Sequence, residues 1–215
     1  MHPVAETGNK YAATLARSVI LTLLAVTGCA IPRFSVYRAP DFAPTRVRRV
    51  IALPFQQETE DVAVGNQVRA ALAAEIQAAG RFEVVPAPDR LTAALAAQAR
   101  RTGRFDQVFV AELGRRFGAD ALMLGTVTAY RPYNKPLLGL KVQIVDTEHG
   151  RVLWAADGLW DTSLRHVVER VRSHYVKRHP MWDQLDGWKI TRLSPARFHR
   201  FVAYELVEAM RDEES

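Results

Sequence analysis

The sequence has 215 residues, of which 48% are hydrophobic and 24% charged, and its formal net charge is +6. Such a chain is long enough for one domain with a substantial hydrophobic core. The basic excess is modest and is dispersed over short runs at residues 46–49, 100–101 and 115–116, which argues against nucleic acid as a partner.

The N-terminal segment is typical of a secretory signal. Lys10 and Arg17 precede an apolar stretch over residues 18–27. A helix of roughly ten residues rises only ~15 Å, about half of a ~30 Å hydrocarbon core, so this stretch is too short to span a bilayer permanently. We therefore expect a signal peptide over residues 1–28.

Cys29, the only cysteine of the chain, directly follows this segment. The sequence Val26-Thr27-Gly28-Cys29 resembles the lipobox of bacterial lipoprotein precursors, in which a small residue precedes the cysteine that becomes lipidated. The resemblance implies cleavage between Gly28 and Cys29, and a diacylglycerol and an N-acyl chain such as palmitate on Cys29. We expect no other cofactor. The alternative is an ordinary signal peptide followed by a buried or spare cysteine.

Residues 29–46 are expected to form a tether. They contain Pro32, Pro40 and Pro44, which discourage helix and regular sheet. At up to ~3.3 Å per residue, a semi-extended tether of this length holds a domain some tens of ångströms from the membrane. Residues 47–215 then form a single domain, with a C-terminal helical extension from about residue 163.

Apolar residues of the domain recur with two periods. They are spaced by four over residues 64–76, as in a helix, and alternate over residues 138–144, as in a strand. Ser194 and Pro195 mark a helix start, as a capping residue followed by a first-turn proline. In chain order we expect a strand at 47–55, a helix at 62–79, a strand at 81–86, helices at 87–101 and 105–117, strands at 120–130, 138–144 and 151–160, a helix at 164–177, an irregular segment at 178–193 and a helix at 194–210.

This β-α-β-α-α-β-β-β-α-α order is typical of an α/β fold. The helices are expected to pack on one mixed sheet, as in an α+β sandwich. The last three strands follow each other through short turns, which predicts an antiparallel meander at the C-terminal end of the sheet.

Four blocks of the domain, at residues 50–55, 80–85, 117–127 and 140–154, resemble the CsgG-like lipoprotein group in sequence and in order. That group includes the curli secretion channel, the LpoB-type activators of peptidoglycan synthases, the PelC-type exopolysaccharide export lipoprotein and the N-terminal domain of TolB. The resemblance covers about residues 47–160, and it implies a fold far more than a function.

The resemblance also implies a location and an alternative function. Ala30 is not the Asp that retains many lipoproteins at the inner membrane, so the implied location is the outer membrane, with the domain facing the periplasm. The curli channel carries long hairpins whose membrane strands need ~9–11 residues each. The loops expected at 56–61, 102–106 and 131–136 are too short for such hairpins, so a channel subunit is only an alternative.

A second alternative is an envelope hydrolase. Asp157 and Asp161 can share one face of a strand, with Glu148 and His149 at the tip of the hairpin, and paired carboxylates can perform acid–base chemistry. The polar outer face of a strand explains these residues equally well. We therefore expect no catalytic residue.

Three histidines, His166, His174 and His179, lie close together in the sequence. Their spacings of eight and five do not align imidazoles on one helix face, as an i, i+4 metal-binding pair requires. We expect no metal site.

All four tryptophans lie in the C-terminal third of the chain. Trp154 is expected in the core. Trp182 and Trp188 belong to the irregular segment, and tryptophan is enriched at protein interfaces and at membrane boundaries. Contact of Trp182 and Trp188 with a partner or the membrane is one interpretation; packing across the last helix is the other.

Together these features predict a non-catalytic envelope lipoprotein that acts as an accessory, assembly or regulatory factor. Its expected partners are the membrane, through the lipid, and a periplasmic or outer-membrane protein such as a cell-wall synthase or an export complex. Copies of the chain itself are a further expected partner, as a homo-oligomeric ring.

Overall fold

The computed structural model describes residues 34–43, 46–61, 63–87, 107–179 and 187–211. The predicted signal peptide, the lipobox residues Gly28 and Cys29, nearly all of the helix predicted at 87–101, and Trp182 lie outside the described residues.

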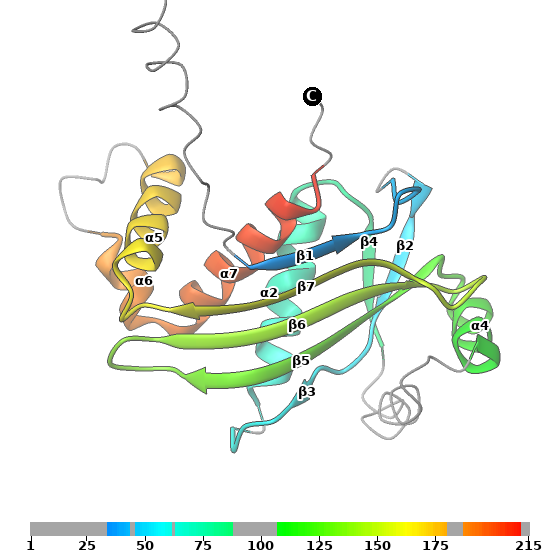
Figure 1. The fold of residues 1–215 in the computed structure, drawn as a ribbon, viewed down its shortest axis with the longest axis horizontal. Coiled ribbons are helices and arrows are strands. Elements are labelled where there is room, and N and C mark those ends of the chain that lie inside the picture. Colours follow the sequence, from blue (N-terminus) through cyan, green and yellow to red (C-terminus); the bar gives the residue numbers. More distant parts are fainter. Residues whose placement is uncertain (1–33, 44–45, 62, 88–106, 180–186, 212–215) are drawn as a thin grey trace, which may run out of the picture. The chain divides into compact units, whose positions relative to one another are not determined.

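A seven-stranded mixed sheet is the centre of the fold (Figure 1). The strands are ordered β1-β7-β6-β5-β2-β4, and β3 lies beside β5. β2 is parallel to β4 and β5, β3 is parallel to β5, and the β5-β6-β7-β1 part is antiparallel. The predicted mixed sheet with an antiparallel meander is confirmed. The strands are β1 Ser35–Arg38, β2 Arg49–Ala52, β3 Gln56–Gln57, β4 Glu83–Pro86, β5 Ala121–Arg131, β6 Leu137–Asp146 and β7 Val152–Asp161.

Five helices are present in the described part of the chain. Four of them fall where the periodicity predicts helix, whereas α6 lies in the segment expected to be irregular. The last helix begins at Pro195 as predicted, although the Ser194 side chain makes no capping hydrogen bond within the described residues. The helices are α2 Val64–Ala78, α4 Gln107–Phe117, α5 Arg165–Arg178, α6 Lys189–Leu193 and α7 Pro195–Ala209.

Hydrophobic residues form one core on each face of the sheet. The larger core lies where α2 and α7 pack side by side, and it includes the fully buried Trp154 and Trp160. The core position predicted for Trp154 is confirmed. The smaller core lies between α4 and the opposite face of β2 and β5, where Leu113 packs with Ile51 and Leu122.

Gly125 allows a close approach within the larger core. A Cβ atom at this position of β5 would lie 2.5 Å from the ring of Phe55. The aromatic ring can pack directly on the strand only because Gly125 has no side chain.

The beginning of the domain differs from the prediction. Residues 29–46 were expected to form a tether, but Ser35–Arg38 form β1, which pairs with β7 at the edge of the sheet. Phe42 and Val47 are buried, and the compact unit of the chain begins at Phe34. A four-residue edge strand tolerates the flanking prolines that argued for a tether.

Candidate functional site

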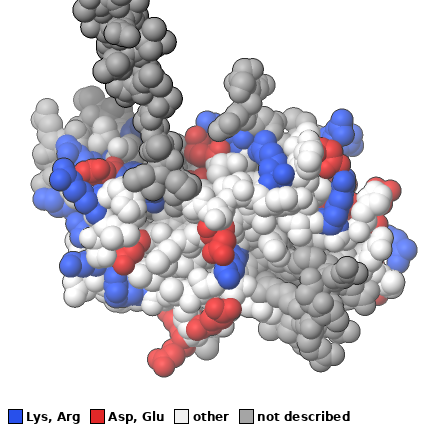
Figure 2. All heavy atoms as spheres, viewed as in Figure 1, with Lys and Arg blue, Asp and Glu red and all other residues white. Residues whose placement is uncertain are grey.

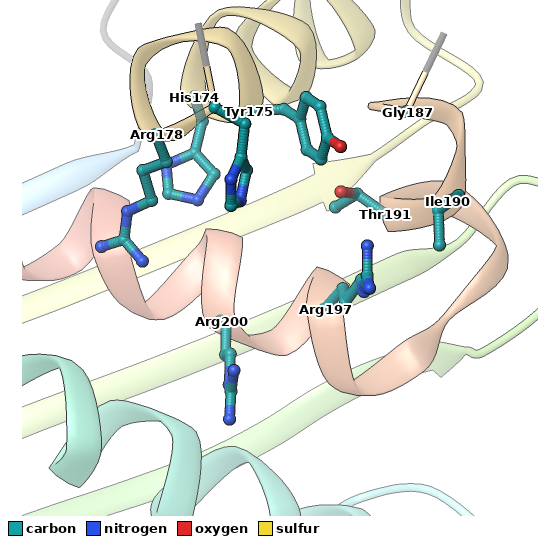
Figure 3. Close-up of a pocket in the computed structure, with 9 residues that line it drawn as sticks. His174, Tyr175, Arg178, Gly187, Ile190, Thr191, Arg197 and Arg200 are labelled. Carbon is teal, nitrogen blue, oxygen red and sulfur yellow. The ribbon is translucent and has the colours of Figure 1, made fainter. Parts of the chain in front are cut away.

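A cavity of about 760 Å³ opens between α5, α6 and the start of α7 (Figure 3). More than half of its lining residues lie in the segment at 178–193, which was expected to be irregular. Arg197 points from α7 toward Thr191 of α6, and Tyr175 faces it from α5 (Figure 3). The lining residues are His174, Tyr175, Arg178, His179, Gly187, Ile190, Thr191, Arg197 and Arg200.

Gly187 shapes one wall of this cavity. A Cβ atom on Gly187 would overlap the hydroxyl of Tyr175. The backbone can approach this hydroxyl so closely only because residue 187 is a glycine. The Tyr175 ring also lies 4.8 Å from the ring of His179. The wall therefore consists of aromatic rings held against the backbone.

An ion pair fastens α5 to α2 behind the cavity. Arg178 donates to both carboxylate oxygens of Glu75, at 2.7 Å and 3.2 Å, and the hydrogen bond to Glu75 raises the pKa of Arg178. The guanidinium also lies over the ring of Tyr204, 5.2 Å from its centroid. Arg178 is therefore a structural cation whose charge is largely balanced by the protein.

A second buried carboxylate joins three elements. Glu205 of α7 accepts a hydrogen bond from Nε1 of Trp160 at 2.7 Å, and its other oxygen lies 3.1 Å from Nε of Arg170. The side chains of Glu205 and Arg170 are only 4% and 16% exposed. This triad connects β7, α5 and α7 through charge-assisted contacts in the interior.

His174 is held neutral beside the cavity. Burial, and after it the nearby positive charge of Arg178, lower the pKa of His174 from 6.5 to about 4. Its ring packs 4.4 Å from the ring of Tyr204 and 5.6 Å from that of Phe201. An imidazole in this state packs as an aromatic side chain at neutral pH.

The other two histidines considered as metal ligands do not form a site with His174. His166 is exposed on α5, and His179 ends that helix beside Tyr175. Among the residues that the structure describes, no three His, Cys, Asp or Glu side chains converge as metal ligands would.

The residues considered for acid–base chemistry are separated in space. Asp157 pairs with Lys141 at 3.6 Å, and Asp161 pairs with Arg131 at 3.2 Å. The two aspartates lie four residues apart on β7, or roughly 13 Å along a strand. Each carboxylate thus has a structural partner.

Glu148 and His149 lie in the turn at the other end of the β6–β7 hairpin. His149 contacts Asp146 at 2.8 Å. Burial raises the pKa of Asp146, but the backbone N–H groups of Glu148 and His149 and the His149 ring outweigh this and lower it. These residues stabilise the turn.

Trp188 is half-buried immediately before α6. Because part of Trp188 is exposed, its predicted contact with a partner or the membrane stays a prediction. Glu75 and Glu205 were not predicted as paired buried residues, although one signal for Glu205 was present. It lies seven residues after Phe198 and four after Phe201, on the apolar face of the last helix.

Comparison with protein-family models and with curated protein sequences finds no match. Among solved structures, a PelC dodecamer variant from Paraburkholderia phytofirmans aligns with a TM-score of 0.52 and 15% identity, over 83% of this chain and 98% of that chain. The fold is similar to that of PelC.

Two further solved structures align more weakly. GNA1162 from Neisseria meningitidis has a TM-score of 0.40 and 21% identity, over 61% of this chain and 96% of that chain. The LpoB C-terminal domain from Salmonella enterica has a TM-score of 0.36 and 14% identity, over 66% of this chain and 93% of that chain. Within the described residues, no helix is long and apolar enough to cross a membrane.

Proposed function

We propose that the chain is a non-catalytic accessory lipoprotein of the bacterial envelope, anchored to the outer membrane through Cys29 and facing the periplasm. The observation that carries this proposal is a PelC-like fold that begins at Phe34, directly behind the lipobox Val26-Thr27-Gly28-Cys29. The order of lipobox and domain, and the short spacing between them, suit a domain held by a lipid rather than by a transmembrane segment.

The lipid supplies the attachment in this proposal. Each buried CH₂ group contributes about 0.8 kcal/mol, so two or more acyl chains on Cys29 give stable anchoring without a transmembrane segment. The side chains considered for hydrolysis, Asp157 and Asp161, lie roughly 13 Å apart along β7 and each pairs with a basic residue, which supports an assembly role over an enzymatic one.

The second part of the proposal is a homo-oligomeric ring, as the dodecameric state of PelC suggests. The face of β1 and β7 opposite α7 carries no helix of the described residues, and Figure 2 shows it as a largely uncharged surface. Tyr37 of β1 and Leu159 of β7 are each 53% exposed there. We assign this uncovered sheet face to contact with a second copy of the chain.

Native mass spectrometry of the detergent-extracted full chain tests the ring. We expect a multiple of the protomer mass, and Leu159→Arg should shift the population toward the monomer because it places a charge in the apolar contact. Val108→Arg is the matched control, since Val108 is 74% exposed on α4, which packs over β2 and β5 rather than over β1 and β7.

Cross-linking in intact cells tests the envelope partner in the same preparations. Repeated capture of one periplasmic or outer-membrane protein would support an accessory role. A strictly monomeric wild-type chain that captures no envelope protein would contradict the proposal.

A further inference from the structure

The positive charge of the chain is concentrated at one end of the sheet. Residues 165–179 and 187–200, which span α5, α6 and the start of α7, hold nine Lys and Arg but a single acidic residue, Glu169; Asp183 and Asp186 lie between these ranges, outside the described residues. Outside residues 165–200 the chain has 20 Lys and Arg against 20 Asp and Glu. We call this region the basic end; its cations are Arg165, Arg170, Arg172, Lys177, Arg178, Lys189, Arg192, Arg197 and Arg200.

Two buried carboxylates that reach the basic end do not neutralise its surface. Glu75 and Glu205 approach it from α2 and α7, but they are buried and already paired with Arg178 and Arg170. Lys177 and Arg197 remain exposed on α5 and α7. Figure 2 shows Lys and Arg gathered at the side of the molecule where α5 and α6 lie in Figure 1.

Apolar side chains are exposed between these cations. Leu164 precedes α5, and Ile190 and Leu193 lie on α6, with exposed fractions of 46%, 47% and 74%. The half-buried Trp188 stands next to them in the chain. Cations combined with exposed Leu, Ile and Trp are the composition of surfaces that lie in a membrane interface.

The beginning of the domain lies at this same end. The ring of Phe34 packs 5.1 Å from that of Trp160, near the end of β7. Trp160 binds Glu205, which pairs with Arg170 of α5. A continuous series of contacts therefore connects Phe34 to the basic end.

The length of chain before Phe34 limits how far this end can lie from a lipid on Cys29. Only four residues separate Cys29 from Phe34, so the two Cα atoms lie at most about 18 Å apart. The long tether expected from the prolines would have allowed any orientation. The short connection favours one in which the basic end faces the membrane.

We propose that the basic end is a membrane-contact surface that binds the head groups of anionic phospholipids and inserts Leu193 and Ile190 among them. This inference rests on the proposed lipid anchor at Cys29. Each Lys or Arg near an anionic surface adds a favourable electrostatic contribution, and the apolar side chains add burial. The lipid attaches the chain to the membrane, and the basic end determines the orientation of the domain relative to it.

Fluorescence quenching in nanodiscs tests this orientation with the lipidated full chain. A bimane label is attached at Leu193→Cys or, as the control, at Val108→Cys; both native side chains are 74% exposed, and Cys29 is blocked by its lipid. The discs contain phosphatidylcholine with or without 30% phosphatidylglycerol, together with a nitroxide lipid. We expect strong quenching at position 193 only in the anionic discs, and little at position 108 in either.

Removing positive charges from the basic end tests whether its contact with the membrane is electrostatic. The pair Lys177→Gln and Arg197→Gln should lower the equilibrium constant for surface contact roughly 10- to 30-fold. Raising the ionic strength from about 0.1 M to about 1 M should act similarly, because the Debye length falls from ~10 Å to ~3 Å. The control pair Arg115→Gln and Arg116→Gln, exposed on α4, should leave the quenching unchanged.

The outcomes distinguish this inference from the anchor on which it rests. Equal quenching at positions 193 and 108, or quenching at 193 that is independent of phosphatidylglycerol, would overturn the membrane-contact surface while the anchor stands. If intact mass shows no lipid on Cys29 and the chain does not enter the discs, both the anchor and the surface are wrong.

Discussion

Glu205 shows how one residue connects distant parts of this chain. Its carboxylate lies inside the larger core, yet both oxygens have partners, Trp160 on β7 and Arg170 on α5. A buried charge is tolerated when it is paired and hydrogen-bonded, and it becomes costly when one partner is removed. The periodicity of the last helix places Glu205 on the apolar face, but it does not indicate which groups pair with the carboxylate.

Replacing Glu205 with Ala should destabilise the fold by about 3 kcal/mol, because Arg170 and the Trp160 N–H lose their partner in the interior. Chemical denaturation measures this loss. The control is Glu208→Ala, whose side chain is 32% exposed in a pair with Arg211 and whose removal should cost under about 1 kcal/mol. Equal losses for the two variants would show that the Glu205 contacts do not stabilise the core.

His199 should make the stability depend on pH. The side chain is buried, and burial lowers its pKa from 6.5 to about 4. Between pH 6.5 and 4 the unfolded chain binds a proton at His199 that the folded chain does not, so the free energy of unfolding falls as the pH falls. The loss approaches about 3 kcal/mol at pH 4, and His174, with a pKa also lowered to about 4, acts in the same direction.

Denaturation of His199→Gln at several pH values checks this account. The variant should lose part of the slope between pH 6.5 and 4, whereas His166→Gln, at an exposed position of α5, should keep the wild-type slope. An unchanged slope in His199→Gln would assign the acid sensitivity to other groups.

At the scale of elements, the segments with a clear apolar period were predictable. Helices α2 and α7 and strands β5, β6 and β7 lie within a few residues of their predicted bounds, because each buries one regular stripe or face. β1 was missed because four residues between prolines carry no period, and only its pairing with β7 defines it. The short helix α6 was missed because its five residues are also too few to show an apolar period.

β1 also holds the end of α7. Nη2 of Arg38 donates to the backbone oxygens of Met210 and Arg211, at 2.5 Å and 3.0 Å, where the helix leaves carbonyl groups without intrahelical partners. The positive charge also suits the negative end of the helix dipole.

Arg38→Gln should therefore cost about 1–2 kcal/mol and speed amide exchange in the last turn of α7. Hydrogen-exchange mass spectrometry resolves that turn from the rest of the helix. The matched control is Arg48→Gln, an exposed side chain immediately before β2, which should alter neither. If the last turn exchanges at the wild-type rate in Arg38→Gln, the clamp between β1 and α7 is wrong.

At the scale of the whole molecule, the charge distribution could not be predicted from the sequence. The sequence showed short basic runs at 46–49, 100–101 and 115–116, but the basic end consists of cations spread over residues 165–200. They form one surface only because α5, α6 and α7 pack around a common cavity. The candidates weighed for acid–base chemistry, Asp157 and Asp161, lie apart along β7, and His166 and His174 lie eight residues apart along α5.

The central claim is that lipid on Cys29 holds this domain at the envelope membrane. Intact-mass spectrometry of the chain extracted from membranes of its native bacterium tests it most directly. The proposal predicts a mature chain that begins at Cys29 and carries a diacylglycerol and an N-acyl group, and a Cys29→Ala variant that is not processed at Gly28. An unmodified Cys29, or a chain cleaved elsewhere and still bound to the membrane, would contradict the account.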